Sequence, residues 1–563
     1  MRGMKTLVTV ALGALLACGG GDTAPTDGGA DGSLDGSIEA EGGPVTPTVS
    51  TWVGTNVSAD LARVDITHQL QPFDTPPNQK DANGYPVAGA SGKSSTDIGF
   101  VLPSGSYKIA YVGTGTLTVS GIGKLSGSWT QSGGEQRATI DITGTPGAFG
   151  NFLTLQITNA QGQTVTNIRI LSPGFDYASP PVFLPSFITL LKPFRALRFM
   201  DWEETNNSTI ASWSNHPTSS SFGQSAYGEP WEHIVELVNE TGKDCWVTVP
   251  EHADDAYIHA MAQYLRANLD FSRIDAARAS QGFAKPFEII VEDSNETWNQ
   301  GFTAYATFAA IAQGNTTKYD GKYTGTFGPS WMTNDAALMK VAQVHGDRLA
   351  NIGNIFKQDF TDHASVVKPA LSGWALGAGF SDASLLIIKA HYGDPKSYVS
   401  YVALAPYFAT ADDTTTGSLG ALFPALDQNI TDMLPALQDF AKLGAQYGIA
   451  IAGYEGGQSI TGNTNLTVKH LAQLDARMHD TYVKYLAEWK QVFGASLFMH
   501  FSLAGTLGLP ENIYQYGFWG SIASVQIDPA TCGKNLPTLS GTEDPKTEAA
   551  HCPKYQALAE QVP

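Results

Sequence analysis

The sequence IIVEDSNETWN, residues 289–299, decides the expected fold, because a short β-branched run passes directly into polar residues. A second segment, IAIAGYEGGQ at residues 449–458, repeats this pattern. Short continuous runs rich in Ile and Val are typical of strands that are buried on both faces of a parallel sheet. Each run therefore predicts a buried strand followed at its carboxyl end by a glutamate, Glu296 in the first segment and Glu455 in the second.

Comparable runs recur through the second part of the chain. From about residue 194 onward they are FRALRFMDW, CWVTVPEH, FEIIVEDSNE, SGWALGAG, SYVALAPYF, IAIAGYEGG and LFMHFSLAG. Helical faces lie between them; one runs through Trp231, Ile234 and Val238 after a proline start. Strands that alternate with helices predict a parallel α/β architecture, and this set is one strand short of a closed (β/α)8 barrel.

The segment TWVGTNVS, residues 51–58, is the best candidate for the missing strand. Between it and the next run, residues 96–171 alternate apolar and polar side chains between Gly, Ser and Asn turns, a pattern typical of an antiparallel sandwich. The predicted fold class is therefore α/β, a (β/α)8 TIM barrel with an antiparallel β-sandwich inserted after the first strand. The alternative is a separate sandwich domain that precedes the barrel.

The amino terminus resembles a bacterial lipoprotein signal. Arg2 and Lys5 precede an apolar stretch, residues 7–17, that is too short to span a bilayer, and Leu-Leu-Ala leads into Cys18. A lipobox of this kind implies cleavage before Cys18 and acylation of that cysteine; the alternative is an ordinary secretory peptide with an incidental cysteine. Residues 19–48 hold almost no large apolar side chain and predict a flexible acidic tether. We expect an exported lipoprotein, held by a lipid anchor at the outer membrane or cell surface.

These patterns divide the chain into six parts. They are a signal peptide (1–17), an acidic tether (18–50), the first barrel strand with its connection (51–95), the sandwich (96–172), the barrel (173–525) and a C-terminal segment (526–563).

Composition narrows the class of partner. The formal net charge is -20, and no cluster of Lys and Arg is present, which argues against nucleic acid. No Cys/His spacing suggests a metal site, and no Gly-rich segment joins a strand to a helix as a nucleotide loop does. We expect a monomer that acts on a neutral substrate without a cofactor or metal.

The chain has four cysteines. Cys18 belongs to the expected lipid site, and Cys245 lies in an apolar run. The remaining two, Cys532 and Cys552, lie in loop-rich sequence of an exported protein, so we expect them to form a disulfide.

The two glutamates and their neighbours resemble the clan A glycoside hydrolases. Members of that clan are retaining TIM-barrel enzymes with an acid/base Glu preceded by Asn, as in Asn295-Glu296, and a nucleophile Glu three strands later, as at Glu455. The chain is more closely similar to bacterial exported proteins that are often labelled cellulose-binding or hypothetical. The segments that carry this similarity are WVGTN, FRALRFMDW, VEDSNETWN, AGYEGGQ and FMHFSLAG, and it covers nearly everything after the tether.

The resemblance implies a retaining glycoside hydrolase that cleaves a polysaccharide or oligosaccharide, with a cellulose-like β-glucan foremost. Retention needs one protonated and one ionised carboxyl about 5 Å apart. Glu296 would be the acid/base, Glu455 the nucleophile, and Asn295 a hydrogen-bond partner of the sugar 2-hydroxyl. The alternative from another class is a non-catalytic carbohydrate-binding lipoprotein, and a transglycosylase would share every residue.

Other side chains at strand ends are candidates for substrate binding: Arg198, Asp201, Trp202, His252, Trp298, Tyr407, His500 and Trp519. Arg198 is expected to keep Glu455 ionised, Tyr407 to donate a hydrogen bond to it, and the tryptophans to stack on sugar rings. The alternative for Arg198 is a structural salt bridge, and for the two histidines it is burial in the core. The alternative for Tyr407 and the tryptophans is packing as core aromatics. Glu292 and Asp293 are the alternative candidates for the role of Glu296. Because side chains alternate along a strand, Glu292 is expected on the same strand face as Glu296.

Overall fold

The computed structural model describes most of the chain beyond the tether. The described residues are 48–57, 62–87, 94–98, 102–143, 152–159, 162–224, 228–409, 417–505, 515–525, 532, 536–543 and 551–562. The expected signal peptide, nearly all of the tether and Cys18 lie outside them. None of the helices in these ranges is long and apolar enough to cross a membrane.

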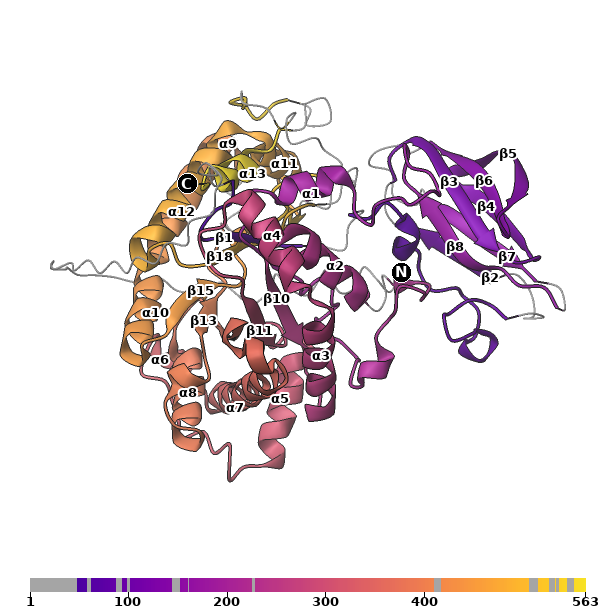
Figure 1. The fold of residues 1–563 in the computed structure, drawn as a ribbon. Helices are drawn as coiled ribbons and strands as arrows, with labels where there is room; N and C mark the ends of the chain where they lie inside the picture. Colours follow the sequence, from indigo (N-terminus) through magenta and orange to yellow (C-terminus); the bar gives the residue numbers. More distant parts are fainter. Residues whose placement is uncertain are drawn as a thin grey trace, which may run out of the picture.

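Eight parallel strands form a closed barrel, which confirms the predicted fold class (Figure 1). In order around the barrel they are β1 (Val53–Asn56), β18 (Phe498–His500), β15 (Ala450–Gly453), β13 (Tyr401–Leu404), β12 (Val367–Gly373), β11 (Ile289–Asp293), β10 (Asp244–Val249) and β9 (Ala196–Arg198). β1 pairs with β9 on one side and with β18 on the other, so residues 53–56 supply the strand that closes the barrel.

Two strand assignments differ from the prediction. The fifth strand covers VKPALSG rather than SGWALGAG, and the residues after Gly373 form the loop that leads into α8 (Gly379–His391). Pro369, which pairs with Val291 inside the sheet, makes this run look unlike a central strand. The expected strand SYVALAPYF ends at Leu404, and Tyr407–Phe408 form the separate short strand β14.

Helices surround the barrel (Figure 1). Their bounds are α1 (Pro185–Leu191), α2 (Trp231–Thr241), α3 (Asp255–Asn268), α4 (Phe271–Gln281), α5 (Thr303–Gly314), α6 (Ser330–Thr333), α7 (Ala336–Asp359), α8, α9 (Leu419–Asp432), α10 (Leu434–Tyr447), α11 (Leu466–Leu474), α12 (Ala476–Phe493) and α13 (Pro553–Ala559). Several starts follow ordinary capping chemistry: Asp254 accepts a hydrogen bond from Tyr257 N, and Asp335 from Leu338 N.

The sandwich is an insertion between the first two barrel strands. One antiparallel sheet contains β2 (Ser94–Ile98), β7 (Leu153–Thr158) and β4 (Thr116–Gly121), and the other contains β5 (Gly123–Ser132), β6 (Glu135–Ile142), β3 (Gly105–Val112) and β8 (Thr166–Leu171). Gly133 and Gly134, with φ of 61° and 85°, make the two-residue turn between β5 and β6. Because β1 pairs with β9 and β18 in the barrel and comes before β2 in the chain, a sandwich that precedes the whole barrel in sequence is ruled out. Figure 1 shows the two sheets beside the barrel.

Small side chains let the barrel strands approach one another. Ala196, Ala370, Ala403 and Ala452 lie in one buried cluster with Trp246. At Gly54, a Cβ would lie 2.8 Å from the backbone carbonyl oxygen of Ala196 as well as 2.4 Å from the sulfur of Met499, so glycine is needed there. The interior is therefore a packed core, and polar chemistry is confined to the strand ends.

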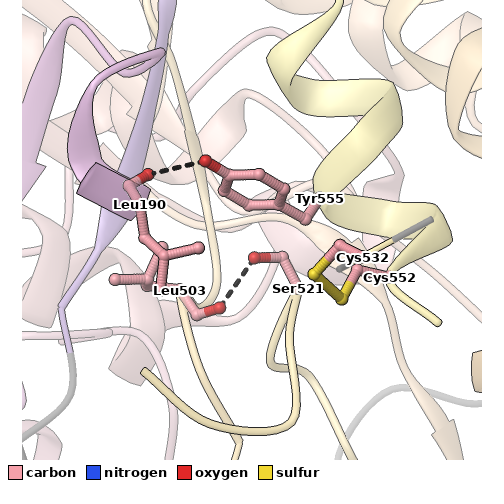
Figure 2. The surroundings of a disulfide bond; sticks show 6 residues. All are labelled: Leu190, Leu503, Ser521, Cys532, Cys552 and Tyr555. Carbon is pink, nitrogen blue, oxygen red and sulfur yellow. Dashed lines mark hydrogen bonds between the residues drawn. A yellow bond between two sulfur atoms is a disulfide. The ribbon is translucent and has the colours of Figure 1, made fainter. Parts of the chain in front are cut away.

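The carboxyl terminus is fixed to the barrel. Cys532 and Cys552 form the expected disulfide, with a Cα–Cα distance of 5.0 Å (Figure 2). The hydroxyl of Tyr555 in α13 donates to the carbonyl of Leu190 at 3.1 Å, which ties α13 to α1. The described part of the C-terminal segment thus packs on the side of the barrel.

Candidate active site

A buried arginine organises the carboxyl end of the barrel. Arg198 is the last residue of β9 and has no exposed surface. Its guanidinium donates to four side chains: Glu455 Oε1 at 2.8 Å, Glu292 Oε2 at 3.0 Å, Asn295 Oδ1 at 2.8 Å and Asn56 Oδ1 at 3.0 Å. One cation therefore joins the ends of β1, β9, β11 and β15, and the prediction that Arg198 pairs with Glu455 is confirmed.

Glu455 follows β15 and is held from both sides. Arg198 donates to Oε1, and the hydroxyl of Tyr407 donates to Oε2 at 2.8 Å. Tyr407 reaches this position because β14 pairs with β16 (Gly457–Gln458), directly after Glu455. Burial raises the pKa of Glu455 above its ordinary value, while Arg198 and Tyr407 oppose that rise. Both contacts favour the ionised carboxylate.

Glu296 lies in a tight loop after β11. Ser294 and Glu296 both have positive φ, 58° and 42°, a conformation that non-glycine residues rarely adopt and that often marks a functional site. The carboxyl is 4% exposed and accepts a hydrogen bond from the neutral amide of Asn299 at 2.8 Å. Burial, with the charge of Glu455 next in importance, raises the pKa of Glu296 to about 8. Near neutral pH this carboxyl therefore keeps its proton.

The two glutamates thus have unlike surroundings within one site. Glu455 faces a guanidinium and a phenol, whereas Glu296 faces a neutral amide and feels the negative charge of its partner. Environments that separate the protonation of two carboxyls assign one of them to acid chemistry and leave the other ionised.

The two rivals of Glu296 have structural partners. Glu292 is fully buried, and its Oε2 accepts hydrogen bonds from Arg198 and from the indole of Trp246 at 2.9 Å. Asp293 points to the opposite face of β11 and lies 3.3 Å from Arg348 and 3.4 Å from His345. Glu292 therefore holds Arg198 in place, and Asp293 joins β11 to α7.

Asn295 is fixed in orientation. Its Oδ1 accepts from Arg198, and its Nδ2 donates to Asn206 Oδ1 at 3.0 Å. An amide nitrogen carries two hydrogens, so one remains for a ligand after the bond to Asn206.

Two of the three candidate tryptophans lie near the carboxyl pair and are partly exposed. Trp298 donates from Nε1 to the hydroxyl of Tyr454, the residue before Glu455, at 3.2 Å. Trp519 makes an edge contact with Phe501 at 5.8 Å, and Phe501 makes another with Tyr407 at 6.4 Å. Both indoles keep accessible surface at this rim.

The structure contradicts sugar contact by Trp202 and His500. Trp202 is 1% exposed and packs against Phe183 and Phe187, so it belongs to the core. His500 is fully buried, and its Nε2 lies 3.0 Å from the hydroxyl of Tyr482. Both side chains lack the surface that a ligand would need.

His252 and Asp201 stay predictions as sugar-binding residues. His252 is exposed in the turn after β10, and Asp201 is half-buried in the turn after β9.

Sequence reasoning missed three residues of the site: Asn56, Tyr454 and Asn299. Asn56 Nδ2 donates to the carbonyls of Tyr454 and His500, and its Oδ1 accepts from Arg198. The position of Asn56 at the end of the WVGTN run is a usable signal, because polar residues at strand ends reach the same rim. Among the described residues, no group of three His, Cys, Asp or Glu is arranged to hold a metal ion.

The chain is similar to solved structures but matches no family model and no curated protein. An alpha-L-arabinofuranosidase from Thermotoga maritima is similar at 12% identity, covering 69% of this chain and 65% of that one, with a TM-score of 0.34. A GH51 arabinofuranosidase from Xanthomonas axonopodis pv. citri covers 60% and 63% at 11% identity and a TM-score of 0.34.

A modular endo-beta-1,4-mannanase from Cellulomonas fimi covers 57% of this chain and 61% of its own at 13% identity, with a TM-score of 0.26. The chain thus spans less than two thirds of the length of each of these three proteins.

Proposed function

We propose that the protein is a retaining glycoside hydrolase. The observation that supports this most is the unlike pair of buried glutamates at the carboxyl ends of the fourth and seventh barrel strands. Glu455 accepts hydrogen bonds from Arg198 and Tyr407, whereas burial raises the pKa of Glu296 to about 8. Retaining hydrolysis needs one ionised and one protonated carboxyl in a single cleft.

In the first step, a Glu455 oxygen attacks the anomeric carbon while Glu296 gives its proton to the departing glycosidic oxygen. The bond between sugar and leaving group breaks, and a glycosyl ester forms on Glu455. In the second step, ionised Glu296 takes a proton from water, the water oxygen attacks the anomeric carbon, and Glu455 leaves as a carboxylate. In this mechanism the second hydrogen of Asn295 Nδ2 bonds the sugar 2-hydroxyl.

The substrate class in this proposal is a neutral polysaccharide or oligosaccharide, with cellulose-like β-glucan first. The net charge of -20 disfavours acidic glycans. Because arabinofuranosidases and mannanases are among the similar structures, arabinans and mannans belong in the substrate panel beside β-glucans and xylans.

The roles of the two glutamates are separable by experiment. Glu455→Ala is expected to lower turnover at least about a thousandfold on every substrate, and azide should restore product with inverted anomeric configuration. Glu296→Ala should still react with aryl glycosides whose leaving group needs no proton, and azide should then give retained configuration.

Glu232→Ala, in which an exposed carboxylate on α2 is removed, serves as the control and should keep wild-type activity. Release of the inverted anomer by wild-type protein would refute the retaining mechanism. Binding of glycans with no cleavage would show that the protein is a carbohydrate-binding protein and not an enzyme.

We further propose that the protein is attached to the outer membrane or cell surface through acylated Cys18. The support is the lipobox and the acidic tether, which the sequence places before the barrel. Cys18→Ser is expected to leave the signal uncleaved or to move the protein from the detergent-extracted membrane to the soluble fraction. Unchanged membrane partition and normal processing of Cys18→Ser would refute the proposed lipid anchor.

A further inference from the structure

Two exposed apolar side chains lie close to the same loop. Trp331 in α6 is 51% exposed and Leu376 in the β12–α8 loop is 46% exposed, more than the other large apolar side chains of the described residues. Trp374 belongs to that loop, and its ring centroid lies 5.2 Å from that of Trp331, edge to face. Exposed large apolar side chains that gather in this way mark a binding surface more often than chance exposure does.

This surface is continuous with the carboxyl pair. Trp374 stacks on Trp298 with the ring centroids 4.8 Å apart and the planes 6° from parallel. Trp298 is two residues after Glu296, and its Nε1 donates to the hydroxyl of Tyr454, the residue before the second glutamate. A series of aromatic rings therefore leads from the two glutamates to the exposed indole of Trp331.

The exposed indole is held on a fixed support. Met332, its neighbour in α6, is fully buried in a cluster with Phe308 and Phe380. The residues just before α6 pack closely on the β12–α8 loop, because a Cβ on Gly377 would lie 2.6 Å from the ring Cδ of Pro329 and 3.2 Å from the Cα of Gly328. The segment before α6 is bound to α8 as well, since the Thr326 hydroxyl donates to Asp382 at 3.0 Å. Burial of Met332 thus forces Trp331 outward in a defined position.

We propose that Trp331 and Trp374 form a sugar-binding platform for the leaving-group part of a glycan chain, an inference that rests on the proposed function. The apolar face of a pyranose ring packs on an indole much as another ring does. The acid protonates the leaving oxygen, and Trp298, which follows the acid Glu296, starts the aromatic series on that side. The platform therefore selects substrates with several sugars beyond the cleaved bond over glycosides with a small leaving group.

The test compares Trp331→Ala with wild type on two substrate types. One is a series of oligosaccharides of increasing length cut from whichever polysaccharide of the panel wild type cleaves, and the other is the aryl glycoside of the same sugar. We expect the ratio of kcat/KM for the longest oligosaccharide to that for the aryl glycoside to fall roughly tenfold, mainly through KM. Trp331→Phe should restore most of the ratio.

Phe152→Ala is the matched control, because Phe152 is an aromatic side chain on the sandwich with 37% exposure. It should leave the ratio unchanged, and thermal melting of each variant checks that the fold is intact. An equal ratio in Trp331→Ala and wild type, with the oligosaccharides cleaved, would overturn the platform while the proposed function stands.

If wild type cleaves nothing, the proposed function fails separately, and retardation in native gels that contain the panel polysaccharides becomes the readout. Weaker retardation of Trp331→Ala than of Phe152→Ala then supports a platform on a binding protein. Equal retardation, or none for wild type, overturns the platform.

Discussion

Arg198 forms ion pairs with two buried carboxylates at once. Glu292 and Glu455 both lie within 3.0 Å of its guanidinium, and no part of Arg198 reaches solvent. In Arg198→Met, an apolar side chain of similar length would leave both carboxylates without their cation. We expect a loss of about 3–5 kcal/mol in the free energy of unfolding, measured by urea denaturation, and loss of activity in the protein that stays folded.

Arg198→Lys tests geometry apart from charge. Lysine keeps the cation but lacks the planar fork that reaches four acceptors in different directions. It should recover part of the stability and little of the activity. Wild-type stability in Arg198→Met would show that the two carboxylates are protonated in the folded protein.

The raised pKa of Glu296 predicts that activity falls at alkaline pH, which gives the pH profile a basic limb. A pKa of about 8 means that the acid form is lost as pH rises through that value, so kcat/KM should fall above about pH 8. Glu296→Ala acting on an aryl glycoside with a good leaving group should lack this limb. Activity that stays flat to pH 10 in wild type would show that Glu296 is not the acid.

The raised pKa of Glu296 also predicts how the free energy of unfolding changes with pH. Because burial first and the charge of Glu455 second raise the folded pKa above the ordinary value of 4.5, folding favours the protonated form. This contribution is fully present below about pH 4.5 and is lost as pH rises through about 8. Glu296→Gln, which stays neutral, should therefore gain stability relative to wild type between pH 6 and pH 9 in thermal melts.

At the scale of elements, the disulfide closes the C-terminal segment onto the barrel. Cys532 and Cys552 are separated by 20 positions, and α13 follows the second of them directly. The double variant Cys532→Ser/Cys552→Ser should lose about 3 kcal/mol of unfolding free energy, because the unfolded chain is no longer constrained. A reducing agent should lower the melting temperature of wild type and leave that of the double variant unchanged.

A barrel strand was predictable from sequence where its own residues show the apolar pattern typical of a buried parallel strand. β11, with Ile-Ile-Val before two acidic residues, and β15 are built on continuous apolar runs, which predict strands of a parallel sheet. β12 is not, since Lys368 and Pro369 interrupt its apolar pattern, and the following SGWALGAG looked more like a strand than the true one. Tertiary pairing with β11 and β13 decides that strand, and no local pattern records it.

The identity of the main site residues was predictable from sequence, but several of their contacts were not. Glu296, Glu455 and Asn295 stand out because polar residues end buried runs. The pairing of Arg198 with Glu455 was predicted, whereas the bond between Arg198 and Asn56, which joins positions 142 apart in sequence, depends on how the barrel closes and was missed. Trp202 is buried against Phe183 and Phe187, and His500 is buried beside Tyr482 of α12; position at or after a strand end does not reveal either contact.

At the scale of the whole molecule, β1 makes the barrel dependent on residues that precede the sandwich. A fragment that begins at Phe194 would lack this strand, so β9 and β18 would present open edges and the core would be exposed. We expect that fragment to be insoluble or to melt without cooperativity, as followed by circular dichroism. A soluble fragment with a cooperative transition would show that seven strands suffice.

The insertion also sets an order of events in time. Val53 is synthesised early but pairs with Phe498, which follows much later in the chain. The hairpin of β5 and β6 needs only its own short turn and is free to form at once, whereas closure across such a long separation is slow. During that interval the first barrel strand has no partner, so we expect the growing chain to depend on holding chaperones until the last barrel strand has been made.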